Sequence, residues 1–204
     1  LLRPSLMPGM LTMLAHNLNR DVPTVRLFEQ GAIFTGSTEE VVESASLSLG
    51  LTGAVAATSL HAAADAPVFE LKGVIESLLS LFTHGEVTFR METPAWLQAG
   101  RSATALLDGQ PIAQFGELSA SETARRKLRQ PVYLAQIDLA SLYALPLRKV
   151  TARELSRFQA VERDFSLTFP DSMQWQTIAA AIRELAIAEL QRLDPVEIFR
   201  DAKG

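Results

Sequence analysis

Apolar residues recur at helical spacing in three stretches of the chain. The first lies near the start of the chain and places five apolar residues on one helix face: Met7, Met10, Leu11, Leu14 and Leu18. Pro8 and Gly9 fall in its first turn, where a helix tolerates these two residue types. The second is the clearest amphipathic pattern, expected to be buried against a sheet, and presents Leu71, Val74, Ile75, Leu78, Leu79 and Phe82. The third, near the end, presents Trp175, Ile178, Ile182 and Leu185.

The intervening segments carry strand patterns. Residues 25–34 have too few charges for an exposed strand and are interpreted as a buried one. In residues 46–51, leucines alternate with Ser and Gly, and this period of two indicates a half-buried strand. Residues 87–91 and 132–137 are further predicted strands. The Ala-rich segment 52–67 is weakly patterned and predicts a loop or a poorly specified helix.

Two local motifs predict connections between these elements. Asp108-Gly109 supplies the positive φ angles that a tight primed turn requires, so residues 102–107 and 111–118 are predicted to pair as a β-hairpin. The Ser and Glu at the two ends of residues 119–122 form a capping box, which predicts a short basic helix through Leu128.

The composition becomes polar and basic around Thr151, where we place a domain boundary. It divides the chain into residues 1–150 and residues 151–204. In the second domain, alternating apolar residues predict strands at 165–169 and 196–198, one on each side of the third helix. This β-α-β order is the first half of a ferredoxin-like β-α-β-β-α-β unit, so the predicted fold class is α+β.

Composition narrows the function classes. The net charge of −4 argues against a protein whose whole surface binds nucleic acid, but it leaves room for a local basic face. Because the chain has no cysteine, disulfide scaffolds, thiolate metal sites and cysteine nucleophiles are excluded, and a reducing compartment fits. No apolar run approaches the roughly 20 residues of a membrane span. The chain begins at Leu1 without a signal-peptide pattern, and we interpret it as a piece of a longer protein.

No self-sufficient catalytic motif is present. The sequence lacks a Gly-rich phosphate loop, a His-Glu-x-x-His pair and a nucleophile elbow. His16, His61 and His84 are far apart and have no acidic neighbours at ligand spacing, so surface or cap positions are favoured over metal ligation. We therefore expect no catalytic residue and no metal site in this chain.

Three basic features are candidates for anion contacts. Lys72, beside Gly73 at the expected start of the second helix, either contacts an anion at the helix N-terminus or is simply solvated. Arg101, in Gly-Arg-Ser-Ala, offers a fork for phosphate or carboxylate, although an ion pair with a nearby acid explains it equally plainly. The third is either a phosphate patch or a solvated face and comprises Arg125, Arg126, Lys127 and Arg129.

Six segments carry a family resemblance over almost the whole chain. They are Leu2-Arg3-Pro4-Ser5-Leu6, Val25–Gly31, Phe69–Leu79, Gly100–Ala103, Phe115–Leu118 and Phe158–Leu167. In this order they resemble the bacterial phenylalanyl-tRNA synthetase beta subunit. One departure is Gln98-Ala99, which stands where that family usually has His-Pro.

The resemblance implies that residues 1–150 form a class II synthetase-like antiparallel sheet, flanked by helices, that has lost its active site. A working class II site needs an Arg-x-Glu element and a Gly-rich element carrying an arginine. Here Arg26 and Glu29 stand at the wrong interval, and Gly100-Arg101 is only a fragment of the second element. The implied role is non-catalytic: pairing with the alpha subunit within a heterotetramer, with self-association of the isolated stretch as a further expectation.

From Phe158 onward the chain resembles the start of the family's ferredoxin-like anticodon-binding domain, whose first strand matches Arg163-Asp164. Arg125, Arg126 and Arg163 are accordingly the expected tRNA contacts. The whole enzyme would be cytoplasmic and would join phenylalanine to tRNA with ATP and magnesium, neither of which this stretch is expected to hold. Two alternatives stay open: a free-standing α+β oligomerisation or ligand-binding domain, and a phosphate-handling enzyme built on Gly100, Arg101 and Lys72.

Overall fold

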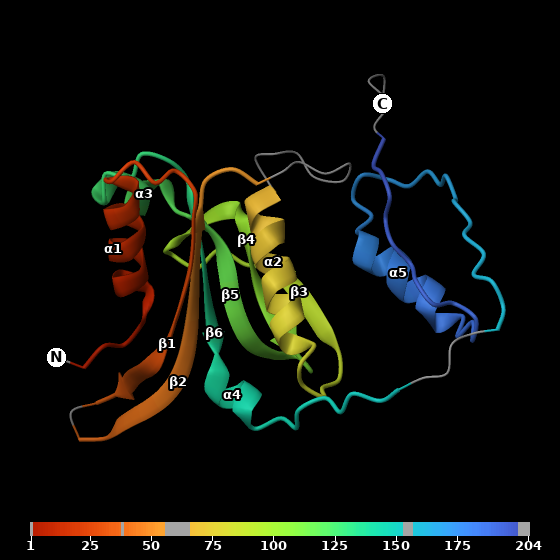
Figure 1. The fold of residues 1–204 in the computed structure, drawn as a ribbon, viewed down its shortest axis with the longest axis horizontal. Coiled ribbons are helices and arrows are strands. Elements are labelled where there is room, and N and C mark those ends of the chain that lie inside the picture. Colours follow the sequence, from red (N-terminus) through yellow and green to blue (C-terminus); the bar gives the residue numbers. More distant parts are fainter. Residues whose placement is uncertain (1, 38, 56–65, 153–156, 200–204) are drawn as a thin grey trace. The chain divides into compact units, whose positions relative to one another are not determined.

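The structure is a computed structural model that describes residues 2–37, 39–55, 66–152 and 157–199 (Figure 1). Its internal contacts divide the chain into two compact units, Leu1–Lys149 and Val150–Gly204. Within the described ranges, no helix is both long enough and apolar enough to cross a membrane.

A six-stranded antiparallel sheet forms the first unit, in the order β1-β2-β6-β5-β4-β3. The strands are β1 (Val25–Gly36), β2 (Val41–Thr52), β3 (Val87–Met91), β4 (Leu97–Leu107), β5 (Gln110–Leu118) and β6 (Val132–Asp138). Strand β6 pairs with β2 on one side and with β5 on the other, so the last strand joins two earlier hairpins into one sheet. The predicted α+β class and all of the strands predicted for this part are confirmed.

Helices cover both faces of the sheet (Figure 1). Helix α1 (Met7–Leu18) buries its predicted apolar face against Val132 and Leu134 of β6. Helix α2 (Ala66–Leu79) and the short α4 (Leu139–Tyr143), which was not predicted, pack on the opposite face. The two-turn α3 (Ala120–Arg125) connects β5 to β6.

The buried stripe of α2 is narrower than predicted. Leu71, Ile75 and Leu79 are almost fully buried, whereas Val74 is 44% exposed and Leu78 is half-buried. A helix that packs on one flat sheet buries a narrow stripe of side chains, here the residues four positions apart. Val74 lies beside this stripe and faces away from the sheet. The expectation that Val74 is buried is therefore wrong.

Strand β1 is not the buried strand that its few charges suggested. It lies at the edge of the sheet, and its Phe28 side chain is 76% exposed. An edge strand has one neighbouring strand instead of two, so an apolar sequence alone does not bury it. The large apolar side chain of Phe28 therefore lies on the protein surface.

Strand β2 is also buried differently from its prediction. Ser46 and Ser48 are almost fully buried, whereas Leu47 and Leu49 are half-buried. At Gly50 an added Cβ would come within 2.6 Å of the Met10 sulfur and 2.9 Å of a Leu14 methyl. Gly50 therefore lets α1 pack closely on this part of the strand.

The predicted turn forms, and the predicted capping box forms in half: the Ser119 side chain caps the helix, while the Glu122 carboxylate pairs with Arg125 and the Ser119 N–H donates to the Trp96 carbonyl. Asp108 and Gly109 adopt φ angles of 49° and 80°, and they join β4 to β5. The Ser119 hydroxyl accepts a hydrogen bond from the Glu122 backbone N–H at 3.4 Å, which caps α3. The helix ends at Arg125 and not at Leu128. Most of the weakly patterned segment, residues 56–65, lies outside the described ranges.

The second unit contains one described helix, α5 (Trp175–Glu184), as predicted. Residues 165–169 and 196–198 form no strand, and Phe165 is 81% exposed. A strand needs a hydrogen-bonded neighbour, and in a split β-α-β unit the neighbour between the two strands comes from the other half of the fold. The predicted strands are therefore wrong for these residues as the structure describes them.

Candidate functional site

A row of polar residues crosses all six strands on the face that carries α1. Directly opposed residues of an antiparallel sheet point to the same side, so the strand register places these side chains together. The row comprises Glu29 (β1), Ser48 (β2), Gln136 (β6), Gln114 (β5), Thr104 (β4) and Arg90 (β3). We call it the polar row, and it is the place where functional groups from every strand meet.

The segment before α1 occupies one end of the polar row. Arg3 Nη1 donates to Glu29 Oε1 at 2.7 Å, while Arg3 Nε donates to the Ala32 carbonyl at 3.0 Å. The Ser5 hydroxyl donates to Gln136 Oε1 at 2.9 Å. The charge of Glu29 is thus neutralised from within the chain.

Glu92, just beyond β3, occupies the other end. Its carboxylate accepts from Arg90 Nε at 2.6 Å and from the Thr104 hydroxyl at 2.5 Å, and its backbone carbonyl accepts from the Ser102 hydroxyl. The Thr104 hydrogen bond, followed by the Arg90 charge, holds the pKa of Glu92 below its ordinary value. The Thr104 hydroxyl is thus held by a carboxylate whose charge Arg90 offsets, and the charged members of the polar row are paired.

Arg26 lies on the opposite face, where α2 begins. Its Nε and Nη2 donate to the two carboxylate oxygens of Glu70 at 2.5 and 2.9 Å, and its Nη1 donates to the Thr52 carbonyl at 2.7 Å. Successive strand residues point to opposite faces, so Arg26 and Glu29, three positions apart, cannot act together. An Arg-x-Glu element would place both groups on one face, and this interval does not.

Arg101 and Lys72 are both engaged with acids. Arg101 Nη1 donates to Glu117 Oε2 at 2.7 Å, which supports an ion pair as the role of this residue. Lys72 Nζ lies 2.6 Å from Glu76 Oε1 and 4.4 Å from the centre of the Phe89 ring. Helix α2 begins at Ala66, so Lys72 is beyond the first turn, where the helix dipole no longer acts. The expectation that Lys72 stands at a helix start is wrong.

The three arginines expected to contact tRNA lie in different units of the chain, Arg125 and Arg126 in the first and Arg163 in the second. Arg125 and Arg126 lie 2.5 and 3.6 Å from the same oxygen of Glu122, and the hydrogen bond from Arg125 leads the effects that lower the pKa of Glu122. Arg163 belongs to the second unit and donates to the Glu162 carbonyl at 3.1 Å.

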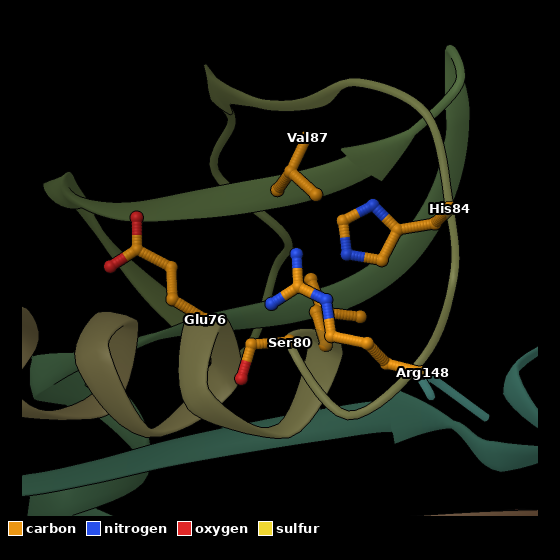
Figure 2. Close-up of a pocket in the computed structure, with 6 residues that line it drawn as sticks. Glu76, Ser80, His84, Val87 and Arg148 are labelled. Atoms are coloured by element: carbon orange, nitrogen blue, oxygen red, sulfur yellow. The ribbon is translucent and has the colours of Figure 1, made fainter. Parts of the chain in front are cut away.

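The described part of the first unit has open depressions on its surface. One, of about 240 Å³, is lined in part by Glu76, His84 and Arg148, and Figure 2 shows the Arg148 guanidinium between the other two side chains. Lys72 already pairs with Glu76, and the Ser80 hydroxyl, which also lines the depression, donates to the Ser77 carbonyl, so the site is open and of mixed charge. Another, of about 380 Å³, lies beside α3. In the part of the chain that the structure describes, no three His, Asp or Glu side chains gather as a metal site.

Comparison with known proteins decides the family. The family model described as the phenylalanyl tRNA synthetase beta chain CLM domain matches residues 1–139. The chain belongs to this family. Similar curated proteins are the phenylalanine–tRNA ligase beta subunits of Xylella fastidiosa strain 9a5c, 31% identical over 190 residues, and of Symbiobacterium thermophilum, 29% identical over 209 residues. These matches cover 90% and 100% of the chain and 23% of each relative, so the chain spans about a quarter of their length.

A solved structure adds a likeness in fold. The pyrrolysyl tRNA synthetase of Desulfitobacterium hafniense superposes with a TM-score of 0.51 at 16% identity, covering 69% of this chain and 48% of that one. At this identity the likeness concerns the fold alone. This chain therefore shares its sheet architecture with part of that solved structure.

Sequence reasoning missed the polar row and the acids that neutralise the candidate arginines. Glu70 lies 44 positions from Arg26 and Glu117 lies 16 positions from Arg101, and helix packing in the first case and strand pairing in the second bring the charges together. The phosphate-handling alternative is not favoured, because Arg101 and Lys72 are paired with acids. A free-standing domain is not favoured either, because the relatives are beta subunits of a ligase.

Proposed function

We propose that this chain is the non-catalytic, catalytic-like part of a phenylalanine–tRNA ligase beta subunit. Residues 1–150 would be an inactive class II synthetase-like domain that supports assembly with the alpha subunit in a heterotetramer. Residues 151–204 would open the ferredoxin-like anticodon-binding domain. The complete enzyme would act in the cytoplasm and attach phenylalanine to tRNA with ATP and magnesium.

The observation that carries the non-catalytic role is the internal pairing of the arginines in the two degenerate motifs. Arg26 is held by Glu70, and Arg101 is held by Glu117. A triphosphate would have to displace a carboxylate from each guanidinium and leave that carboxylate unpaired, which is unfavourable in a partly buried site. The residues present therefore do not fit ATP, and the described part of the chain offers no carboxylate cluster for magnesium.

The surface of β1 supports the assembly role. Phe28 is 76% exposed on β1, which is an edge strand of the sheet. Large exposed apolar side chains on an edge strand are typical of surfaces that a partner covers, and obligate interfaces bury upwards of about 2,000 Å². The alpha subunit is the partner we assign to this surface.

Two measurements on the same preparation test the proposal. Phenylalanine-dependent exchange of pyrophosphate into ATP should stay at the level of a no-protein control for the chain alone. Co-expression with a tagged alpha subunit should retain the chain on the affinity resin. Exchange above the control would contradict the non-catalytic role, and loss of the chain in the wash would contradict the assembly role.

A further inference from the structure

A short backbone contact fixes the last residues of the first unit beside the loop that follows α2. The Thr83 N–H donates to the Pro146 carbonyl at 2.8 Å, and the Arg148 N–H donates to the Leu81 carbonyl at 2.7 Å. The residues between these two hydrogen bonds pair as an isolated antiparallel bridge. The backbone of Arg148 therefore has a defined place next to the end of α2, although the residue lies outside the helices and strands of the described chain.

This contact brings Arg148 to the open depression of about 240 Å³. The last turns of α2, the loop after it and the start of β3 line the depression, and Leu79 and Val87 are its apolar residues. Figure 2 shows the Arg148 guanidinium between the side chains of Glu76 and His84. Four separate segments thus place a cation, an acid and an imidazole around one space.

The Arg148 guanidinium is available to a ligand. Among the residues that the structure describes, none forms an ion pair or a side-chain hydrogen bond with it, and Arg148 is exposed. The nearby Glu76 accepts from Lys72 Nζ through Oε1 at 2.6 Å. Two cations therefore stand against one carboxylate, and a guanidinium presents its N–H groups as a fork that matches two oxygens of an oxyanion.

His84 and Ser80 add acceptors to this site. The Nδ1 of His84 lies 2.9 Å from the Gly85 carbonyl oxygen, and because a carbonyl oxygen only accepts, Nδ1 carries the proton. The other ring nitrogen, Nε2, accepts a hydrogen bond when the imidazole is neutral and donates one when it is charged. The Ser80 hydroxyl donates to the Ser77 carbonyl at 2.7 Å, so its oxygen lone pairs face a ligand as acceptors. The depression therefore combines a fork of donors with several acceptors.

We propose that this depression binds a phosphate group that retains an O–H, either as inorganic phosphate or at the end of a small phosphorylated molecule. The Arg148 fork holds two phosphate oxygens, and the phosphate O–H donates to Glu76 or His84. An oxyanion without a proton, such as sulfate, instead places a charged oxygen against the Glu76 carboxylate, where like charges repel. The bound phosphate joins the segment around Arg148 to the end of α2. This site goes beyond the proposed function and does not rest on it.

Binding is measured by NMR on the 204-residue chain at about pH 6, near the second pKa of a phosphate monoester, so that each phosphate probe retains an O–H. Inorganic phosphate, glycerol phosphate and sulfate are titrated at one ionic strength set with chloride. The ring resonances of His84 report binding, and those of His16 on α1 are the internal reference. We expect a saturable shift at His84 alone, with a Kd of about 1 mM for phosphate and at least about fivefold weaker binding of sulfate. Glycerol phosphate that binds as tightly as phosphate identifies the end of a small molecule as the ligand, and phosphate that binds alone identifies the free ion.

Three variants test the roles of the side chains. Arg148→Gln removes the fork and should weaken phosphate binding about tenfold. The matched control, Lys149→Gln, removes the same charge from the next residue, which is exposed and does not line the depression, and should bind within about twofold of the wild type. Glu76→Gln replaces the repelling carboxylate by an amide that can donate, so sulfate should then bind as tightly as phosphate.

Several outcomes would overturn the inference. They are equal affinities of the wild type for phosphate and sulfate, a comparison that needs no variant, the lack of a saturable shift at His84, and equal weakening by Arg148→Gln and Lys149→Gln. Urea midpoints of all variants show that each is folded. Retention on the tagged alpha subunit is measured in parallel: intact retention without phosphate binding rejects only this site, whereas loss of wild-type retention rejects the proposed function independently.

Discussion

Arg26 and Glu70 form a two-pronged ion pair, with Nε–Oε1 and Nη2–Oε2 distances of 2.5 and 2.9 Å, across the start of α2. The same guanidinium donates to the Thr52 carbonyl at the end of β2. One side chain therefore ties the edge strand, the neighbouring strand and the next helix together. Arg26, the arginine of the degenerate Arg-x-Glu element, thus has a structural role in this chain.

Removing this pair should destabilise the first unit. Arg26→Met leaves the Glu70 carboxylate and the Thr52 carbonyl without their donor, and we expect a loss of about 1–2 kcal/mol in urea unfolding, since both partners are about one-third exposed. Arg3→Met, which breaks the more exposed pair with Glu29, is the control and should cost less. Equal losses of unfolding free energy in the two variants would contradict the structural role assigned to Arg26.

Two glycines should respond oppositely to alanine. At Gly50 an added Cβ would lie 2.6 Å from the Met10 sulfur, so Gly50→Ala should cost about 1–3 kcal/mol by overpacking α1. At Gly73, inside α2, an added Cβ meets nothing within 4 Å, and Gly73→Ala should stabilise by up to about 1 kcal/mol. Chemical denaturation of both variants measures the difference, and a Gly50→Ala variant as stable as the wild type would show that α1 does not pack closely on Gly50.

The Glu92 pairing predicts a loss of stability in acid. The Thr104 hydroxyl and Arg90 hold the pKa of Glu92 below its ordinary value in the folded chain. The unfolded chain therefore binds the proton more readily, and stability is present above the ordinary carboxyl pKa and is lost as the pH falls through the folded pKa. Thr104→Val should weaken this dependence, while Thr88→Val on the neighbouring strand should not. Urea midpoints across the acid range measure it, and identical profiles for Thr104→Val and wild type would refute the assignment.

Phe28 provides the test of the partner surface. Phe28→Asp places a charge on the exposed edge strand and should weaken retention by the alpha subunit at least about tenfold, because a buried unpaired charge is costly. Leu81→Asp, at a side chain that is 56% exposed, is the control and should be retained normally. If both variants are retained like the wild type, the partner covers another face.

The local periodicity of the sequence predicted most of the elements. The α1 face from Met7 to Leu18 and the turn at Asp108-Gly109 follow from spacings and backbone preferences that neighbouring residues set by themselves. The ordered segments that resemble the beta subunit predicted the family, and the family model confirmed it over residues 1–139.

Burial and pairing depended on the tertiary structure. Phe28 is exposed because β1 came to lie at an edge, and Gly50 is closely packed because Met10 and Leu14 of α1 came to lie over it. The predicted strand at 165–169 did not form because strand pairing requires a neighbour that its own sequence does not supply.

The same distinction governs the site. The sequence by itself determined that Arg26 and Glu29 stand three residues apart on a strand and therefore point to opposite faces. Only the tertiary structure decided that Glu70 and Arg3 are their partners, 44 and 26 positions away. Spacing along a strand is a local property of the backbone, whereas an ion pair between distant segments exists only after strand register and helix packing have brought the two charges into contact.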